Sequence, residues 1–234
     1  MVPRYDQAWI RQHHGPLSTR RMCTALERIL RHLGRSVDDT ALGKISRRAD
    51  PFAVLVSCLI SLRTKDEVTD VVAPRLLALA PSPARLGELP EARIAELIYP
   101  AGFYRTKAAT LRALGRTLRD EHQGRVPDSL AGLLALRGVG RKTANLVLGL
   151  GFGQAAICVD THVHRISNRL GWVVTRTPAQ TEQALMVVLP KRYWIPINEL
   201  LVRFGQTVCT PLSPWCSRCP VSRWCDRVGV ERSR

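Results

Sequence analysis

Hydrophobic positions recur at the three-to-four-residue spacing of a single helix face from residue 22 onward. The first such face ends before Gly34, a residue suited to closing a helix, and consists of Met22, Leu26, Ile29, Leu30 and Leu33. Residues 1–21 lack this spacing, so we expect a flexible N-terminal extension there.

A second helix is predicted to begin at Asp50-Pro51, because aspartate suits an N-cap and proline suits the first helical position. Its run 52–62 is apolar nearly all round, which predicts a buried central helix. Pro74 is expected to break or kink the next helix, and the cluster at 81–83 to separate it from the one that follows. The remaining helices are expected near 67–79, 91–98, 105–121, 129–136, 141–150, 160–170, 178–189 and 196–206. Alternating apolar and polar positions are almost absent, so the predicted fold class is all-α.

The charge balance narrows the choice of partners. Lys and Arg number 35 against 19 Asp and Glu, a net charge of +16, in a chain of 234 residues with ordinary globular composition. Such an excess favours a polyanionic partner. No uncharged apolar run of about 18 residues exists, which disfavours a membrane, and the N-terminus does not resemble a secretory signal. We therefore expect a cytoplasmic, nucleoid-associated protein. In that compartment, metal or redox chemistry explains a set of seven cysteines better than a disulfide framework does.

The segment after Thr207 has little apolar material, so it needs a cross-link, such as a bound metal, to become ordered. It carries a C-x6-C-x2-C-x5-C pattern made by Cys209, Cys216, Cys219 and Cys225. Four thiolates so close in sequence can surround one metal centre, and the spacing leaves a structural zinc and an iron–sulfur cluster equally open. The other cysteines, Cys23, Cys58 and Cys158, are interpreted as small buried hydrophobes.

Two glycines separated by one apolar residue, Gly138-Val139-Gly140, join two short predicted helices. Glycine permits positive φ and lets backbone N–H groups approach a phosphate closely. The next helix begins at about Arg141, and its N-terminus adds free N–H donors and the positive end of a dipole. With the high net charge, we interpret this turn as a clamp for a nucleic-acid backbone rather than as a turn without a ligand.

Lys142 follows in the first turn of that helix, and Asp160 lies at the start of a later one. Each has an ordinary explanation: Lys142 as a solvated surface charge, and Asp160 as a helix N-cap. Together they also suggest an amine nucleophile and a carboxylate facing it, since a helix N-terminus and nearby arginines disfavour the ammonium form. A lysine and a carboxylate beside a phosphate clamp indicate covalent chemistry at a sugar carbon.

The motifs resemble those of the endonuclease III branch of the helix–hairpin–helix DNA glycosylases. The hairpin 136–145, the aspartate motif Val159-Asp160-Thr161-His162 and the four-cysteine tail occur in the family's order, and the resemblance covers about residues 22–228. It implies a 4Fe–4S cluster in the tail. It also implies a monomer that acts on double-stranded DNA with damaged bases or abasic sites, with the damaged base flipped into a pocket.

The resemblance further implies two helical lobes. A six-helix domain with the helix–hairpin–helix would span 44–154, and an iron–sulfur domain would combine 22–43 with 155–234. Lys142 would be the Schiff-base nucleophile of a bifunctional glycosylase and AP lyase for oxidised pyrimidines, and Asp160 would be the catalytic carboxylate. The hairpin residues Gly138, Val139, Gly140 and Arg141 would bind DNA.

Two further positions align more loosely with the family. Arg63 stands where the family inserts a glutamine into the space left by the flipped base, and Phe103 stands in a loop that wedges an apolar residue into the duplex. Arg137 replaces a proline before the glycine pair, and the loop 210–215 lacks the basic residue of the type member, which puts that loop's contact with DNA in doubt. Arg203, Arg218, Arg223 and Arg227 are the nearby candidates to replace it.

Two other functions remain open at this point. An adenine or mismatch glycosylase of the same superfamily would carry a residue other than lysine at position 142. A non-catalytic, iron–sulfur module that binds damaged DNA would need neither Lys142 nor Asp160.

Overall fold

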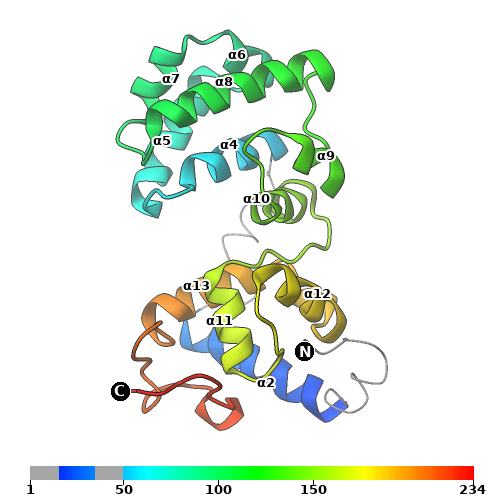
Figure 1. The fold of residues 1–234 in the computed structure, drawn as a ribbon, viewed down its shortest axis with the longest axis vertical. Helices are drawn as coiled ribbons and strands as arrows, with labels where there is room; N and C mark the ends of the chain where they lie inside the picture. Colours follow the sequence, from blue (N-terminus) through cyan, green and yellow to red (C-terminus); the bar gives the residue numbers. More distant parts are fainter. Residues whose placement is uncertain (1–15, 35–49) are drawn as a thin grey trace. The chain divides into compact units, whose positions relative to one another are not determined.

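The computed structural model describes residues 16–34 and 50–234, and these contain helices and no strands, as predicted (Figure 1). The chain divides into two compact units. One unit is Arg48–Gln154, and the other combines Ala155–Arg234 with the N-terminal helix. The predicted boundary at residue 44 lies outside the described residues. None of the described helices is long and apolar enough to cross a membrane.

The unit 48–154 is built from seven described α-helices and one π-helical turn. These are α4 (Pro51–Ser61), α5 (Asp66–Leu79), α6 (Pro83–Glu88), α7 (Glu91–Ile98), α8 (Tyr104–Glu121), α9 (Leu130–Ala135), α10 (Arg141–Leu146) and η2 (Val147–Gly151). Helix α4 is its centre, because its buried residues face α5, α8, α10 and η2. The Asp50 carboxylate caps it by accepting from the Phe52 N–H at 3.0 Å, with Pro51 in the first turn, which confirms the predicted start and the predicted buried helix.

Pro74 lies on the exposed face inside α5 and does not end this helix, so the expected break is wrong; on an exposed face, the carbonyl that loses its N–H partner is not left in an apolar core. The proline cluster at 81–83 separates α5 from the next helix, as predicted. The cluster at 81–83 opens an additional short helix, α6. The Ser82 hydroxyl accepts from the Arg85 N–H, and Pro83 takes the first position of this helix.

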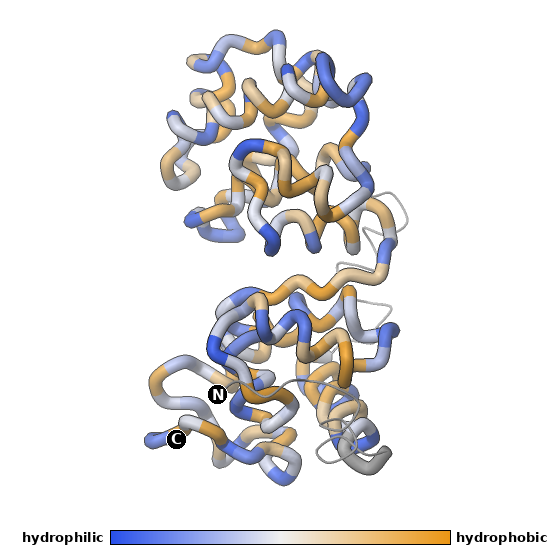
Figure 2. The backbone as a smooth tube through the Cα atoms, turned by 45° about the vertical axis from the view of Figure 1, so that its right-hand side comes forward, coloured by the Kyte–Doolittle hydropathy of each residue, from blue (hydrophilic) through white to orange (hydrophobic). Residues whose placement is uncertain are grey.

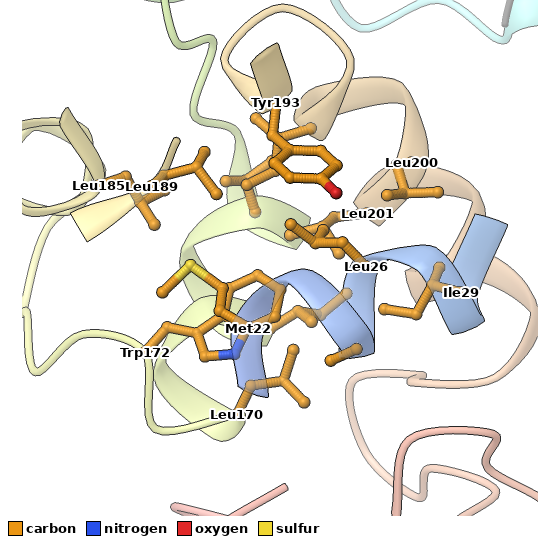
Figure 3. Packing of buried hydrophobic residues seen from close by; sticks show 14 of the residues in the cluster. Met22, Leu26, Ile29, Leu170, Trp172, Leu185, Leu189, Tyr193, Leu200 and Leu201 are labelled. Atoms are coloured by element: carbon orange, nitrogen blue, oxygen red, sulfur yellow. The ribbon is translucent and has the colours of Figure 1, made fainter. Parts of the chain in front are cut away.

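The other unit is also helical. Its elements are α2 (Pro16–His32), α11 (Thr161–Arg169), α12 (Pro178–Val188), η3 (Lys191–Tyr193), α13 (Ile197–Thr207) and η4 (Ser222–Trp224). The apolar face of α2 packs into a core formed by the later helices (Figure 3). The labelled residues there are Met22, Leu26, Ile29, Leu170, Trp172, Leu185, Leu189, Tyr193, Leu200 and Leu201. In both units, hydrophobic and hydrophilic residues interleave along the helices, as an amphipathic helical fold requires (Figure 2).

The N-terminal helix begins earlier than expected. Residues 16–21 were predicted to belong to a flexible extension, yet they form the first turns of α2, while residues 1–15 lie outside the described part. Proline suits the first position of this helix, and Arg21 is held by an ion pair with Asp226 at 2.8 Å. Cys158 is buried as predicted, whereas Cys23 and Cys58 are only partly buried.

Candidate functional site

The glycine turn predicted from the sequence joins α9 to α10. Gly138 has φ +84°, which favours glycine, and a side chain there would also press against the Thr110 methyl group. Gly140 is the N-cap of α10 and faces open space, so a side chain would fit there without a clash. The backbone of this turn is therefore accessible at Gly140, while Gly138 is required by the turn itself.

Val139 and Arg141 take different places in the turn. The Val139 side chain is buried, and its N–H donates to the Leu136 carbonyl at 3.1 Å. Val139 therefore supports the turn from inside and has no N–H to offer a phosphate. Arg141 is the first residue of α10 and is half-buried.

Lys142 is the second residue of α10 and its side chain is exposed in its own unit. Its positive charge reaches the Cys58 thiol on α4. Burial raises the pKa of Cys58 to about 12, and the Lys142 charge opposes this rise. The chain thus places an accessible amine directly after the glycine turn.

Asp160 is the N-cap of α11 and belongs to the other unit. Its Oδ1 accepts from the Val163 N–H at 2.8 Å, and the side chain is half-buried. The ordinary interpretation of Asp160 as a cap is therefore confirmed. This bond uses one lone pair of one oxygen, and the carboxylate keeps further acceptor positions.

Arg63 and Phe103 are brought together. Arg63 lies between α4 and α5, Phe103 lies just before α8, and the Arg63 guanidinium sits 5.6 Å from the centre of the Phe103 ring. Both side chains are exposed, and both residues adopt positive φ, +53° and +56°. A left-handed backbone at two non-glycine residues is costly and is concentrated at functional turns. The sequence contained no signal for this pairing, since the two residues are 40 positions apart.

The four cysteines of the tail line one cavity, together with apolar side chains such as Phe204, Val208 and Val221. Their donor chemistry, four sulfurs around one space, fits an iron–sulfur cluster or a zinc ion. Within residues 16–34 and 50–234, no three His, Cys, Asp or Glu side chains converge closely enough to form a finished metal site. The four thiols therefore line one cavity, but their sulfur atoms are not close enough together to ligate a metal as they stand.

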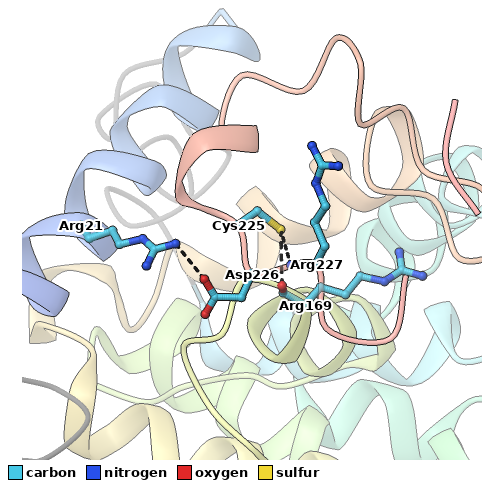
Figure 4. Close-up of polar contacts among 5 residues, drawn as sticks. All are labelled: Arg21, Arg169, Cys225, Asp226 and Arg227. Carbon is cyan, nitrogen blue, oxygen red and sulfur yellow. Dashed lines mark hydrogen bonds and ion pairs between the residues drawn. The ribbon is translucent and has the colours of Figure 1, made fainter. Parts of the chain in front are cut away.

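Hydrogen-bond donors surround these sulfurs. The Arg169 guanidinium donates to Cys209 Sγ at 3.6 Å. The Arg227 backbone N–H donates to Cys225 Sγ at 3.4 Å (Figure 4). Burial raises the pKa of Cys219 to about 11 and also raises that of Cys225. Buried thiolates need positive charge nearby, which a metal centre would supply.

The loop 210–215 gains positive charge from residues outside it. The guanidinium groups of Arg218 and Arg234 each lie 4.0 Å from the centre of the Trp215 ring. Arg234 also donates to the Ser213 carbonyl at 2.8 Å. Arg218 is one of the predicted replacements for the missing basic residue. Arg234 could not be predicted, because only the fold brings residue 234 to this loop.

The sequence of this chain is similar to those of known DNA repair proteins. The model of the HhH-GPD superfamily of base excision DNA repair proteins matches residues 56–191. Endonuclease III of Thermotoga maritima is 49% identical over 173 residues, which span 74% of this chain and 81% of that protein. The endonuclease III-like protein 1 of Bos taurus is 40% identical, and the match spans 78% of this chain and 59% of that protein.

Solved structures show the same fold. A trapped endonuclease III–DNA covalent intermediate aligns with a TM-score of 0.76 at 30% identity, covering 89% of this chain and 96% of that one. A non-covalent endonuclease III–DNA complex aligns with the same TM-score and identity, covering 95% of its own chain.

Proposed function

The chain belongs to the endonuclease III family of the HhH-GPD superfamily, and from this membership we propose that Lys142 is the nucleophile of its reaction. Members of this family are DNA glycosylases and AP lyases, and so is this protein. The observation that carries the proposal is the position of Lys142, an exposed amine in the first turn after the glycine hairpin.

The proposed chemistry begins with the neutral Lys142 amine. Its nitrogen lone pair forms a bond to C1′ of the damaged nucleotide, and the bond from C1′ to the base breaks, with the electron pair leaving on the base. One Nζ proton then passes to the ring oxygen O4′ as the C1′–O4′ bond breaks, which opens the sugar ring and leaves a protonated imine between Nζ and C1′. Loss of a proton from C2′ then expels the 3′ phosphate, which nicks the strand by β-elimination.

Asp160 supplies negative charge in this scheme. A carboxylate near the sugar stabilises the positive charge that develops as the base leaves. Its capping bond to Val163 holds it in a fixed orientation, so little reorganisation is needed during the reaction. Oxidised pyrimidines are the proposed substrates, and an adenine or mismatched base is the alternative within the superfamily.

DNA contacts are assigned to two surfaces of the unit 48–154. The hairpin backbone at Gly138 and Gly140, followed by Arg141, would hold the phosphate backbone without reading sequence, and Val139 would support the turn from inside. Arg63 and Phe103 would enter the duplex, the arginine towards the base left without a partner and the ring between neighbouring bases. Their cation–π contact supports a joint role.

A 4Fe–4S cluster is proposed for the four-cysteine cavity. Cys209, Cys216, Cys219 and Cys225 would hold it, and the N–H donors of Arg169 and Arg227 would stabilise their thiolates. When bound, the cluster would order the tail, and the catalytic step above does not pass through it.

Borohydride trapping tests the nucleophile. With duplex DNA containing thymine glycol or an abasic site, the native protein should give a covalent adduct, because borohydride reduces the imine to a stable amine. Lys142→Gln should give none and should still bind the same DNA. Trapping by Lys142→Gln would show that another amine attacks the sugar. A panel of damaged bases, each opposite all four normal bases, would rank oxidised pyrimidines against adenine and mismatches.

A further inference from the structure

Lys107 is buried although it is a lysine, with 9% of its surface exposed. It lies in the first turn of α8, four residues after Phe103. Its ammonium turns inward, donating to the Ile60 carbonyl at 2.5 Å and to Thr64 Oγ1 at 2.7 Å. One side chain of α8 therefore reaches both the last turn of α4 and the loop that carries Arg63.

Thr64 completes this connection. Its hydroxyl accepts from the Gly102 N–H at 3.1 Å as well as from Lys107, and it lies 3.5 Å from the Leu62 carbonyl, to which it donates. A hydroxyl has one hydrogen to donate and two lone pairs, so all of its capacity is used. The loop before α8 and the loop after α4 are thus joined through one oxygen atom.

The backbones of the two loops also touch. A Cβ at Gly102 would collide with the Arg63 carbonyl oxygen, so only glycine fits at this position. The contact places the two left-handed residues, Arg63 and Phe103, next to each other with their side chains exposed. Holding two strained loops in this arrangement requires interactions that outweigh the backbone cost.

We propose that Lys107 is a positioning residue for DNA binding: through Ile60 and Thr64 it fixes the loops of Arg63 and Phe103 so that both side chains enter the duplex together. This inference rests on the proposed role of that pair. Lys107 does not contact DNA itself, because its ammonium is directed into the protein and bonded there. Burial lowers the pKa of Lys107 to about 8, and the neutral amine still has two N–H donors, so both bonds survive deprotonation.

The test uses a duplex with a tetrahydrofuran abasic-site analogue opposite 2-aminopurine, whose fluorescence rises when it loses stacking. Lys107→Met keeps the length of the side chain and removes its donors. We expect the fluorescence rise at saturating protein to fall, and the preference for the abasic-site duplex over undamaged duplex to fall about tenfold, as for lost bonds to a buried charged group. Affinity for undamaged duplex should stay within about twofold, because no phosphate contact is lost.

Three further variants separate positioning from folding and charge. Thr64→Val should reproduce the effect of Lys107→Met, and Thr64→Ser, which restores the hydroxyl, should behave as the native protein. Lys65→Met removes an exposed charge from the same loop and should leave the saturated fluorescence unchanged. If Lys107→Met fails to fold, the comparison of Thr64→Val with Thr64→Ser tests the positioning role. A reduced fluorescence rise in Thr64→Val but not in Thr64→Ser would support it, and equal rises would overturn it.

Arg63→Ala and Phe103→Ala separate the inference from the proposed function on which it rests. If Arg63→Ala and Phe103→Ala both give the native fluorescence rise, the two side chains do not enter the duplex as proposed, and the positioning role of Lys107 is overturned as well. A reduced rise in both, combined with a native rise in Lys107→Met or in Thr64→Val, would overturn the positioning role alone.

Discussion

At the scale of single residues, Asp160 combines two roles that can be separated by substitution. One role is structural, since its carboxylate caps α11. The other is the proposed electrostatic role at the sugar, which needs the negative charge. Asparagine is as good an N-cap as aspartate but is neutral, whereas alanine loses both properties.

Asp160→Asn should therefore keep the native free energy of unfolding and lower single-turnover base excision by about 100-fold, the size typical for a lost electrostatic group. Asp160→Ala should lose the same activity and, in addition, about 1 kcal/mol of stability. Urea unfolding and single-turnover excision measure the two effects. Native excision by Asp160→Asn would leave this residue as a cap only.

Lys107 should titrate at an unusual pH. Its pKa in the folded protein is about 8, below its ordinary value of 10.5, because burial disfavours the charged form. Between these two values the unfolded chain binds more protons than the folded one, so stability from this residue rises with pH. The free energy of unfolding of the native protein, relative to Lys107→Met, should increase from pH 8 to pH 10.5. A flat difference over this range would show a lysine with an ordinary pKa.

At the scale of elements, the hairpin shows two glycines with different reasons for being glycine. Gly138 is fixed by its positive φ and by the nearby Thr110 methyl group. Gly140 has ordinary extended dihedral angles and open space around it, so nothing within the protein requires glycine there. If glycine is needed at position 140, the reason must be a ligand that approaches the backbone closely.

Gly138→Ala should lose about 2 kcal/mol of stability through the left-handed conformation. Gly140→Ala should lose only about 0.5 kcal/mol, the difference between glycine and alanine at an N-cap. If this turn holds a phosphate, Gly140→Ala should nevertheless weaken binding to undamaged duplex, measured by fluorescence anisotropy. Native affinity in a stably folded Gly140→Ala would remove the turn from the DNA-binding surface.

The same scale shows where sequence analysis was sufficient. Helix periodicity and helix caps predicted α4, α7, α8, α11 and α13 closely. Apolar faces and capping residues such as Asp50 can be recognised from residues that are neighbours in the sequence. The start of α2 and the short α6 were missed, and α5 was predicted at the right place but is not broken at Pro74. Packing in the whole unit decides whether such segments are helical.

For the candidate site, motif spacing in the sequence points to candidate residues, but it carries no information on the side chains that support them. Lys142, Asp160 and the four cysteines stand in motifs that can be recognised by spacing. Lys107 could not be identified, because nothing in a linear sequence distinguishes a lysine that turns inward from one on the surface. The contact between Arg63 and Phe103 likewise depends on two loops meeting in space.

At the scale of the whole molecule, the four-cysteine tail has little apolar material to order it. It is tied to the rest of its unit by the ion pair of Arg21 with Asp226 (Figure 4). The Arg169 guanidinium adds a second tie by donating to the Thr210 carbonyl. A metal centre would add the strongest such tie, since metal binding free energy becomes folding free energy.

The purified protein should be brown, with broad visible absorption and matching contents of iron and acid-labile sulfide. Removal of the metal should lower the Tm, because the buried thiols lose the charge that balances them. Metal analysis, absorption spectra and thermal unfolding check these outcomes. A colourless protein with stoichiometric zinc after anaerobic purification would exclude the cluster.

Helix α11 connects the two chemical centres proposed for its unit. Asp160 stands at its first end, and at the other the Arg169 guanidinium donates to the carbonyls of Thr210 and Pro211 beside Cys209. A nine-residue helix is a rigid rod about 14 Å long. A displacement of the loop at Cys209 would therefore move the far tip of this rod and reorient the Asp160 carboxylate, which would alter excision without any change at Lys142.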